Sequence, residues 1–390
     1  ANHVGPDAET SPNSLPRVSA DAWRPRRARG SPARASTRRS PGGSPRRPGP
    51  NREWRNPRIE PAGSVRPRTM TASAAAAPGP PADPSMLGRL GGLLVGLTSG
   101  VAKAAAIGYV GVCALAFAFQ RKLQYFPTTE HPPAVATLPP AYGDIEEFTV
   151  RTEDGVTIRG YHLPVPTMNI AHTKHPKIHL LQLHGNAGSR YHRIPWAHYT
   201  RVRLGCAVTL LDYRGYGGSE GKVTEAGMIL DGKAGIQWAA TRANETGSKL
   251  VLHLESIGSA AGICAAAALR KDARGGDIGV AGIVAEGGLS SCIEIAEKVF
   301  SFLPVRLMMK DKWNGVCGAA ASLDPAMPFM SMHGTRDEIV PFWCGKKLFE
   351  SSSSTRKVLK EFKRGGHNNL ADQTGYIEAL DEFYTTVESL

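Results

Sequence analysis

The chain has 390 residues and a formal net charge of +13, from 47 Lys and Arg against 34 Asp and Glu. This length exceeds that of the usual single domain and predicts one sizeable domain with appendages. Residues 1–85 carry 15 Arg and six acidic residues, which is +9 of the total. The basic charge therefore belongs mainly to one end, and it does not by itself indicate a nucleic-acid-binding domain.

The first 85 residues also contain no Lys and 16 of the 29 prolines. With few large apolar side chains they cannot bury enough surface to offset their ordering entropy, so we expect this tail to be disordered. An organellar transit peptide, a solvated tail, translated sequence upstream of a start at Met86, and a fragment beginning at Ala1 all remain open. Nucleic acid is not an expected partner, because the tail has only two aromatic residues, Trp23 and Trp54.

Residues 86–127 are predicted to hold the protein in a membrane. The stretch 90–119 is strongly apolar and carries Lys103 as its only charge. As a helix it is long enough to cross the hydrocarbon core of about 30 Å, with the lysine snorkelling. Arg121 and Lys122 then mark an interface. We interpret the segment as a single-pass signal anchor; a cleaved signal peptide and a buried core helix are the alternatives. Its orientation is open, because both flanks are basic.

Residues 128–390 are predicted to form an α/β domain with a mostly parallel eight-stranded sheet, helices on both faces and a small lid region at about 287–323. The first two strands, separated by 153–155, indicate an antiparallel hairpin at the edge. Later strands such as 249–254 are nearly continuous apolar runs, which is typical of parallel strands buried on both faces. The predicted strands are 145–150, 157–163, 178–184, 207–212, 249–254, 279–285, 328–333 and 356–362. The predicted helices are 191–203, 224–241, 257–271, 291–302, 342–351 and 375–389.

Ser256 lies where a strand is followed at once by a helix. The run 249–254 leads into it, and the small-residue helix 257–271 begins directly after it. Such a turn exposes a serine hydroxyl and aims a helix N-terminus at the site, so we predict a nucleophile. Gly258 supplies one small flank, but Leu254 stands where the G-x-S-x-G pattern has its first glycine and is expected to crowd the turn. The alternative is an ordinary helix-capping serine.

The literal G-x-S-x-G match, residues 217–221, is not predicted to be this turn. No strand runs directly into Ser219, because a glycine-rich stretch intervenes, and no helix begins directly after it. Both features are required of a nucleophile turn. We interpret the match as a structural loop beyond a strand end.

Two further side chains complete a predicted triad. Asp337 follows the seventh strand and is the predicted acid; capping of the next helix is its alternative role, and Glu286 and Glu338 are weaker rivals. His367 lies in a glycine-rich loop after the last strand and is the predicted base. The order serine, aspartate, histidine is that of the α/β-hydrolase fold. The histidine would take the Ser256 proton as the hydroxyl attacks a carbonyl, while the aspartate orients the imidazole.

The oxyanion formed by this attack needs preorganised N–H donors. One is expected from Ile257 at the helix start. The other is expected from the loop after the strand 178–184, where we favour Asn186, with Ala187 as the alternative. No cofactor and no metal is expected, and the six cysteines show no C-x-x-C or metal-ligand spacing.

Several short motifs occur in order along residues 104–390. They are Gln120-Arg-Lys-Leu-Gln-Tyr-Phe-Pro127, His184-Gly-Asn-Ala-Gly188, Asp212-Tyr-Arg-Gly-Tyr-Gly-Gly-Ser-Glu-Gly221, Glu255-Ser-Ile-Gly258, His333-Gly-Thr-Arg-Asp337 and Gly366-His-Asn368. Together they resemble the membrane-anchored α/β-hydrolase-domain proteins of the Bem type. The resemblance implies a triad of Ser256, Asp337 and His367, an oxyanion loop at 184–188, and a serine-aminopeptidase-like hydrolase domain. The chain departs from the family at Leu254 and Ser259, where glycines are usual.

These observations predict a membrane-anchored serine hydrolase that cleaves an ester or thioester through an acyl-enzyme. The anchor favours an acyl-bearing lipid or a lipidated protein as substrate, since it holds the site at a bilayer. Relatives of the resembled group include protein depalmitoylases, so a palmitoyl-protein hydrolase is one expectation. The alternative, motivated by Leu254, is a catalytically impaired membrane scaffold with a hydrolase fold.

Overall fold

The computed structural model describes residues 84–166 and 173–390, so the interpretations of the tail lie outside the described residues. The strands are β1 (Phe126–Pro127), β2 (Glu146–Arg151), β3 (Thr157–Leu163), β4 (Ile178–Leu183), β5 (Ala187–Gly188), β6 (Ala207–Leu211), β7 (Lys249–Glu255), β8 (Val280–Glu286), β9 (Phe329–Gly334) and β10 (Lys357–Phe362). The α-helices are α1 (Pro84–Gln124), α2 (Arg190–Leu204), α3 (Glu225–Glu245), α4 (Ile257–Asp272), α5 (Cys292–Val299), α6 (Val305–Met308), α7 (Val316–Ala321), α8 (Phe342–Ser351) and α9 (Tyr376–Glu388). Short 3₁₀ turns occur at Val135–Thr137 and Pro140–Tyr142.

Eight of the strands form one sheet, in the order β10-β9-β8-β7-β4-β6-β3-β2. The pairs β2–β3 and β3–β6 are antiparallel, and every other neighbouring pair in this sheet is parallel. The predicted mostly parallel sheet and its edge hairpin are therefore confirmed. Parallel strands end at the same edge, so the loops that follow β4, β7, β8, β9 and β10 all leave from one side of the sheet.

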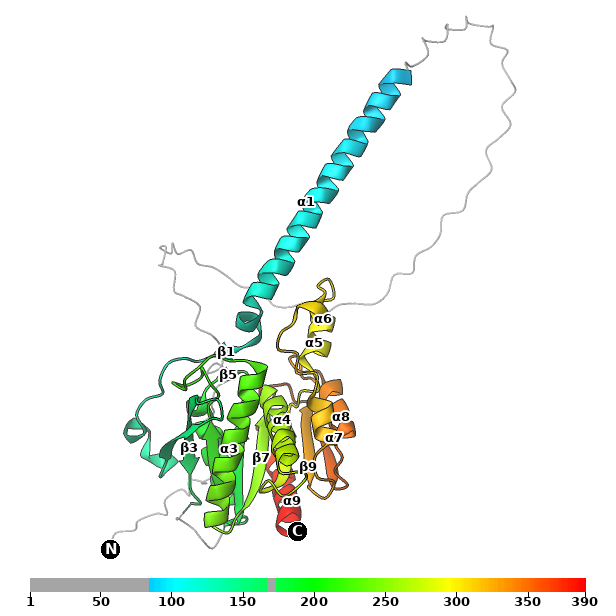
Figure 1. Ribbon diagram of the computed structural model, residues 1–390. Helices are drawn as coiled ribbons and strands as arrows, with labels where there is room; N and C mark the ends of the chain where they lie inside the picture. Colours follow the sequence, from blue (N-terminus) through cyan, green and yellow to red (C-terminus); the bar gives the residue numbers. More distant parts are fainter. Residues whose placement is uncertain (1–83, 167–172) are drawn as a thin grey trace, which may run out of the picture. The chain divides into compact units, whose positions relative to one another are not determined.

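Helices cover both faces of this sheet (Figure 1). One buried cluster joins the sheet to α3, α4, α7 and α8, and a second joins it to α2 and α9. Successive strand residues alternate between the two: Leu250 and Leu252 of β7 belong to the first, and Val251 between them to the second. This two-sided burial explains the continuous apolar runs in the sequence, because side chains on a strand point alternately to opposite faces.

The long helix α1 presents its apolar side chains to solvent. It has 41 residues, which corresponds to about 61 Å at 1.5 Å per residue. Its segment Gly88–Gln124 is long and apolar enough to cross a membrane, and none of its most apolar window is buried inside the protein. The helix is therefore not a buried core helix.

The C-terminal end of α1 is built into the folded domain. Tyr125, directly after the helix, is 3% exposed and accepts a hydrogen bond from Trp313 Nε1 at 3.1 Å. Arg121 pairs with Asp311 through two contacts of 2.7 and 3.1 Å. The strand β1 then pairs with β5, with Phe126 opposite Ala187. These contacts leave no free linker between the helix and the domain.

The segment between β8 and β9, where the lid was predicted, has two parts. The helix α7 packs against α4 and α8, and its Val316 and Ala320 are buried. By contrast the segment formed by α5, α6 and the residues between them carries the exposed apolar residues Phe300, Phe302 and Leu307. Figure 1 shows α5 and α6 at the end of the domain next to α1.

Leu254 fits beside the turn between β7 and α4 because a glycine faces it. The side chain is fully buried, and a methyl group added at Gly262 of α4 would lie 2.4 Å from Leu254 Cδ2. The leucine branch thus occupies the volume that a side chain at Gly262 would take. The sequence predicted crowding at the chain reversal before α4. The structure instead places the leucine against Gly262, about one and a half helical turns into α4.

We predict that Gly262→Ala destabilises the protein. An alanine normally stabilises a helix interior by about 1 kcal/mol relative to glycine. Here the overpacking against Leu254, typically about 1–3 kcal/mol, opposes that gain and exceeds it. Thermal unfolding of the full chain in detergent should show a lowered Tm. Gly318→Ala in α7 is the matched control, because nothing lies within 4 Å of the added methyl group.

The contact is tested by repeating Gly262→Ala in a Leu254→Ala background. Leu254→Ala alone should cost about 2–5 kcal/mol through its cavity. In that background Gly262→Ala should cost less, since the branch it meets is gone. The same loss in both backgrounds would contradict the packing argument.

Candidate active site

Ser256 occupies a strained turn between β7 and α4. Its backbone has φ 54° and ψ −119°, and it is one of three non-glycine residues with positive φ among those the structure describes. Such a conformation persists only where the surroundings impose it. Gly258 provides part of this constraint, because a methyl group there would lie 2.1 Å from the Leu183 carbonyl oxygen. The close approach of α4 to β4 explains why only glycine fits at that position.

The structure brings Ser256, His367 and Asp337 together in a line. His367 Nε2 lies 3.0 Å from Ser256 Oγ, and His367 Nδ1 lies 2.7 Å from Asp337 Oδ2. All three side chains are largely buried. The Ser256 side chain makes no capping bond to α4, so the alternative of a helix-capping serine is wrong.

Asp337 uses its two oxygens differently. Oδ1 accepts hydrogen bonds from the backbone N–H groups of Ile339 and Val340, at 2.9 and 2.8 Å. These bonds fix the turn after β9, and they leave Oδ2 facing the imidazole. The alternative role of capping the next helix is not seen, because Pro341 is the N-cap residue of α8 and no side chain caps that helix. The carboxylate instead holds the preceding turn through one oxygen and contacts the imidazole through the other.

The rival carboxylate Glu286 belongs to a separate network. Its Oε2 contacts His253 Nε2 at 2.8 Å and accepts from Tyr376 OH at 2.7 Å. Trp196 Nε1 donates to the same tyrosine hydroxyl at 2.9 Å. The backbone oxygen of Glu286 accepts from Ser256 N at 2.8 Å, so this residue supports the strained turn through its main chain.

The charges around the imidazole favour its protonated form. Burial lowers the pKa of His367, but the Asp337 hydrogen bond and the nearby carboxylates of Glu255 and Glu286 outweigh burial and raise it above 6.5. Burial also opposes ionisation of Asp337, yet hydrogen bonds from His333 and His367 hold the pKa of this carboxyl well below its usual range. An imidazolium formed during a reaction would therefore be stabilised.

The loop after β4 passes directly beside the serine. A methyl group added at Gly185 would lie 3.4 Å from Ser256 Cβ. Side chains hold three of the loop's carbonyl oxygens: Tyr213 OH donates to that of His184 at 2.9 Å, Tyr216 OH to that of Asn186 at 2.9 Å, and Arg193 to that of Ala187 at 3.4 Å. The peptide planes of this loop are thereby fixed.

The same loop is tied to the end of α1. Asn186 Nδ2 donates to the Gln124 carbonyl oxygen at 2.6 Å, and the Gln124 side chain donates to the Asp311 carbonyl oxygen at 2.9 Å. The β1–β5 pairing lies directly beside these bonds. Gln124 therefore connects the loop next to Ser256 with the segment that follows α6.

Sequence reasoning missed the ion pair next to the serine. Glu255 receives two hydrogen bonds of 2.7 Å from the Arg193 guanidinium, and a methyl group at Gly185 would lie 2.8 Å from its Oε1. Burial raises the pKa of Glu255, but the charge and hydrogen bonds of Arg193 outweigh it and lower the pKa overall. No local pattern joins residues 62 positions apart, so the sequence carries no signal for this pair.

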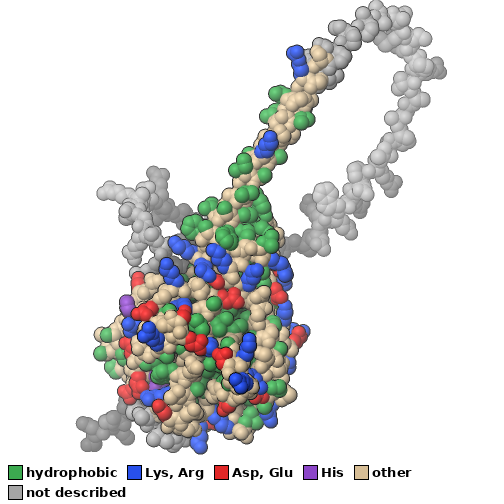
Figure 2. Space-filling model, in the orientation of Figure 1, with side chains coloured by type: hydrophobic (Ala, Val, Ile, Leu, Met, Phe, Trp, Pro, Cys, Tyr) green, Lys and Arg blue, Asp and Glu red, His purple; other side chains and the backbone are tan. Residues whose placement is uncertain are grey.

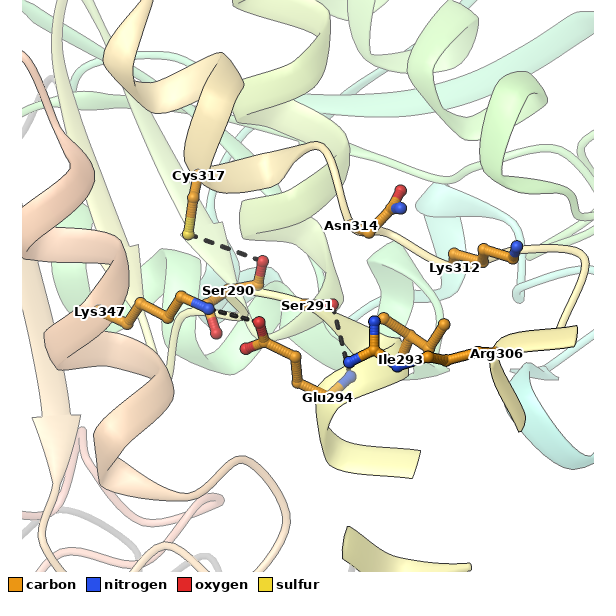
Figure 3. Close-up of a pocket in the computed structure, with 9 residues that line it drawn as sticks. All are labelled: Ser290, Ser291, Ile293, Glu294, Arg306, Lys312, Asn314, Cys317 and Lys347. Atoms are coloured by element: carbon orange, nitrogen blue, oxygen red, sulfur yellow. Dashed lines mark hydrogen bonds and ion pairs between the residues drawn. The ribbon is translucent and has the colours of Figure 1, made fainter. Parts of the chain in front are cut away.

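A polar cavity of about 230 Å³ lies beside the segment that follows β8 (Figure 3). Glu294 and Lys347 form an ion pair across it. The triad side chains do not line this cavity, and its polar walls do not suit an acyl chain. The lining residues are Ser290, Ser291, Ile293, Glu294, Arg306, Lys312, Asn314, Cys317 and Lys347.

The amino-acid sequence is similar to that of several known proteins. An uncharacterized membrane protein of Saccharomyces cerevisiae is 32% identical over 46% of this chain and 61% of its own length. The Schizosaccharomyces pombe protein bem46 is 26% identical over 62% of this chain and 76% of its own. The Arabidopsis thaliana α/β hydrolase domain-containing protein WAV2 is 27% identical over 65% of this chain and 83% of its own. The chain belongs to the α/β-hydrolase superfamily, with the Bem-type proteins.

No family model matches this α/β-hydrolase. Among solved structures, an esterase of Pyrococcus furiosus aligns with a TM-score of 0.49 at 20% identity, over 67% of this chain and 98% of its own. The fold itself is seen in the strand order and helix layers described above.

The hydroxyl of Ser219 serves the loop in which it lies. Its Oγ accepts a hydrogen bond from Arg159 N at 3.0 Å and donates to the Asp212 carbonyl oxygen at 3.4 Å. The literal G-x-S-x-G match in this α/β-hydrolase thus closes a turn against β3.

We predict that Ser256→Ala abolishes labelling of the protein by a fluorophosphonate, whereas Ser219→Ala retains it. Ser256 Oγ has an imidazole nitrogen at 3.0 Å to accept its proton, whereas the contacts of Ser219 Oγ are with backbone groups. Ser219→Ala should lower stability by about 1–3 kcal/mol, because Arg159 N loses its acceptor. In-gel fluorescence of membranes containing each variant provides the measurement. Loss of labelling in folded Ser219→Ala together with retention in Ser256→Ala would reverse the assignment.

We predict that the acid limb of the pH–kcat/KM profile has its midpoint above pH 6.5. His367 accepts a proton only when neutral, and its pKa is raised, so activity is lost as pH falls through that raised value. Asp337→Asn removes the hydrogen-bonded charge, which should move the midpoint to lower pH and reduce kcat by about 10⁴-fold. The profile is measured with a small water-soluble ester. An unshifted midpoint in Asp337→Asn would contradict the coupling of these two groups.

Proposed function

We propose that this hydrolase cleaves esters or thioesters through an acyl-enzyme on Ser256. The observation that carries the proposal is the continuous contact from Ser256 Oγ to His367 Nε2 and from His367 Nδ1 to Asp337 Oδ2, at 3.0 and 2.7 Å. A serine on a strained strand-to-helix turn, next to a neutral base that a carboxylate orients, is the arrangement that acyl transfer requires.

The reaction has two symmetrical halves. His367 takes the hydroxyl proton while Ser256 Oγ attacks the carbonyl carbon, and it then donates that proton to the departing alcohol or thiol. Water attacks the acyl-enzyme in the second half and gives its proton to the same nitrogen. His367 then returns that proton to Ser256 Oγ as the acyl–oxygen bond breaks, which releases the acid and the free serine. Asp337 stays ionised and stabilises the imidazolium in both halves.

Two backbone N–H groups are proposed to bind the oxyanion. Ile257 is the first residue of α4, so its N–H points out of the helix N-terminus beside the serine. Asn186 is the proposed second donor, with Ala187 as the alternative. The Asn186 N–H shares its peptide with the Gly185 carbonyl, whose oxygen lies 2.6 Å from His184 Nδ1, and the Ala187 N–H shares its peptide with the Asn186 carbonyl, which Tyr216 OH holds. Both peptides are therefore held, and a trans peptide N–H points opposite to its C=O. A donor held in place before the reaction costs no reorganisation during it.

We further propose that α1 is a single-pass membrane anchor and that the substrate is an acyl-bearing lipid or a lipidated protein, including palmitoyl-cysteine thioesters. The exposed apolar surface of α1 supports the anchor, and an anchored site encounters substrates that reside in membranes. The impaired-scaffold alternative lacks its original support, because Leu254 packs against Gly262 while the contact between Ser256 and His367 is kept.

The proposal is tested with the full chain in lipid vesicles and a panel of p-nitrophenyl esters and acyl-cysteine thioester peptides of increasing chain length. We expect turnover that Ser256→Ala removes, with a preference for long acyl chains. Rapid mixing should also give a burst of product equal to the enzyme concentration, and mass spectrometry should find the acyl group on the peptide that contains Ser256. Turnover that persists in Ser256→Ala, or no turnover of any panel member, would overturn the proposal.

A further inference from the structure

The α5–α6 segment ends in an apolar tip that nothing in the described chain covers. We call Val299, Phe300, Phe302 and Leu307 the lid tip. Their exposed fractions are 62%, 45%, 63% and 86%. Four large apolar side chains are thus exposed within nine residues, beside Arg306, which pairs with Glu297. Exposed apolar side chains gathered in this way mark an interaction site in a folded protein.

The lid tip lies alongside the apolar part of α1. Tyr109 OH donates a hydrogen bond of 2.9 Å to the Phe302 carbonyl oxygen. Tyr109 precedes Arg121 by 12 residues, which is about 18 Å along the helix. The tip therefore extends beyond the basic end of α1 to the level of its most apolar stretch. Figure 2 shows hydrophobic side chains continuing from the helix onto the adjoining end of the domain.

The backbone of the lid tip suits an environment without water. Unpaired N–H and C=O groups are costly in hydrocarbon, so a segment that enters it must satisfy them internally. The Phe302 carbonyl is satisfied by Tyr109. Other backbone groups around the tip also pair within the segment. The N–H groups of the following residues donate to its carbonyl oxygens: Phe300, Leu303, Val305, Leu307, Met308 and Met309.

Basic side chains border this apolar surface on the side of the domain. Lys310 lies 4.4 Å from the centroid of the Phe117 ring, and Lys122 lies 5.8 Å from that of Phe119. Lys298, at the base of the lid tip, lies 4.0 Å from the centroid of the Trp343 ring. Amines held on aromatic rings at an apolar boundary match the interfacial level of a bilayer, where such side chains reach the headgroups.

We propose that the lid tip inserts into the lipid bilayer beside α1, in the leaflet next to the domain, and that the enzyme draws acyl chains from that leaflet. This inference rests on the proposed function and on α1 as the anchor. The segment that carries the tip begins at the active site: a methyl group added at Gly287 would lie 3.3 Å from His367 Cε1. An inserted tip thus joins the hydrocarbon region to the wall of the catalytic site.

Insertion is tested without reference to activity. Phe302→Trp is introduced into the full chain in phosphatidylcholine–phosphatidylserine vesicles, and its added fluorescence over wild type is compared with and without brominated phosphatidylcholine. Val202→Trp in α2 is the matched control, since Val202 is 55% exposed and lies away from the lid tip. We expect bromine to quench the emission added at residue 302 and not that added at residue 202.

An equal response of the two variants would overturn insertion. Blue-shifted emission at residue 302 that bromine does not quench, and that depends on protein density in the vesicle, would instead assign the lid tip to a second copy of the chain.

The substrate route is tested with Phe302→Asp and Leu307→Asp, against Val202→Asp as control. Each charged variant should lower kcat/KM for a long-chain ester dissolved in the vesicles by about tenfold or more, since burial of one such side chain is worth at least that factor. Turnover of a water-soluble short-chain ester in the same vesicles should stay unchanged. Equal losses on both esters would overturn the route, whereas absent turnover in wild type together with bromine quenching would overturn only the proposed hydrolysis.

Discussion

The positive φ of Ser256 is the constraint on which the rest of the site depends. A non-glycine residue in this conformation costs of order 1–3 kcal/mol, so the surrounding structure must impose it. Ser256 is the single residue between the end of β7 and the start of α4. The contact between Gly258 and the Leu183 carbonyl sets the distance between α4 and β4. The hydroxyl is consequently turned away from the helix N-terminus, where it would act as a cap, and toward His367.

A second layer of polar contacts holds the loop that faces this serine. The Asp212 carboxylate accepts from the backbone N–H of Arg190 and pairs with the Arg190 guanidinium. Tyr213 and Tyr216, from the same motif as Asp212, donate to the carbonyl oxygens of His184 and Asn186. The two motifs that follow β4 and β6 are thus one structural unit. Their tyrosines shape the loop by holding its carbonyl groups, and the oxyanion donors that we propose belong to this same loop.

The sequence predicted the site where the signal was local. Ser256 follows β7 directly, Asp337 and His367 lie in the loops after β9 and β10, and each has a short pattern that places it at the same sheet edge. Contacts set by packing between distant segments were not predictable: Leu254 with Gly262, Glu255 with Arg193, and Asn186 with Gln124. From the sequence, Leu254 was expected to crowd the turn before α4. The structure relieves this crowding through Gly262 on α4, and whether Gly262 faces the leucine depends on how the helix packs on the sheet.

The junction after α1 has a mechanical consequence for an anchored enzyme. Tyr125 lies in the core and Phe126 pairs beside the loop that faces the serine, so the chain passes from helix to domain without slack. A tethered enzyme on a flexible linker samples many heights above its membrane. With α1 as the anchor that we propose, the site around Ser256 would be held at one height and one orientation relative to the bilayer. Bonds at that height are accessible, and equally reactive bonds farther out on a tall substrate are beyond its reach.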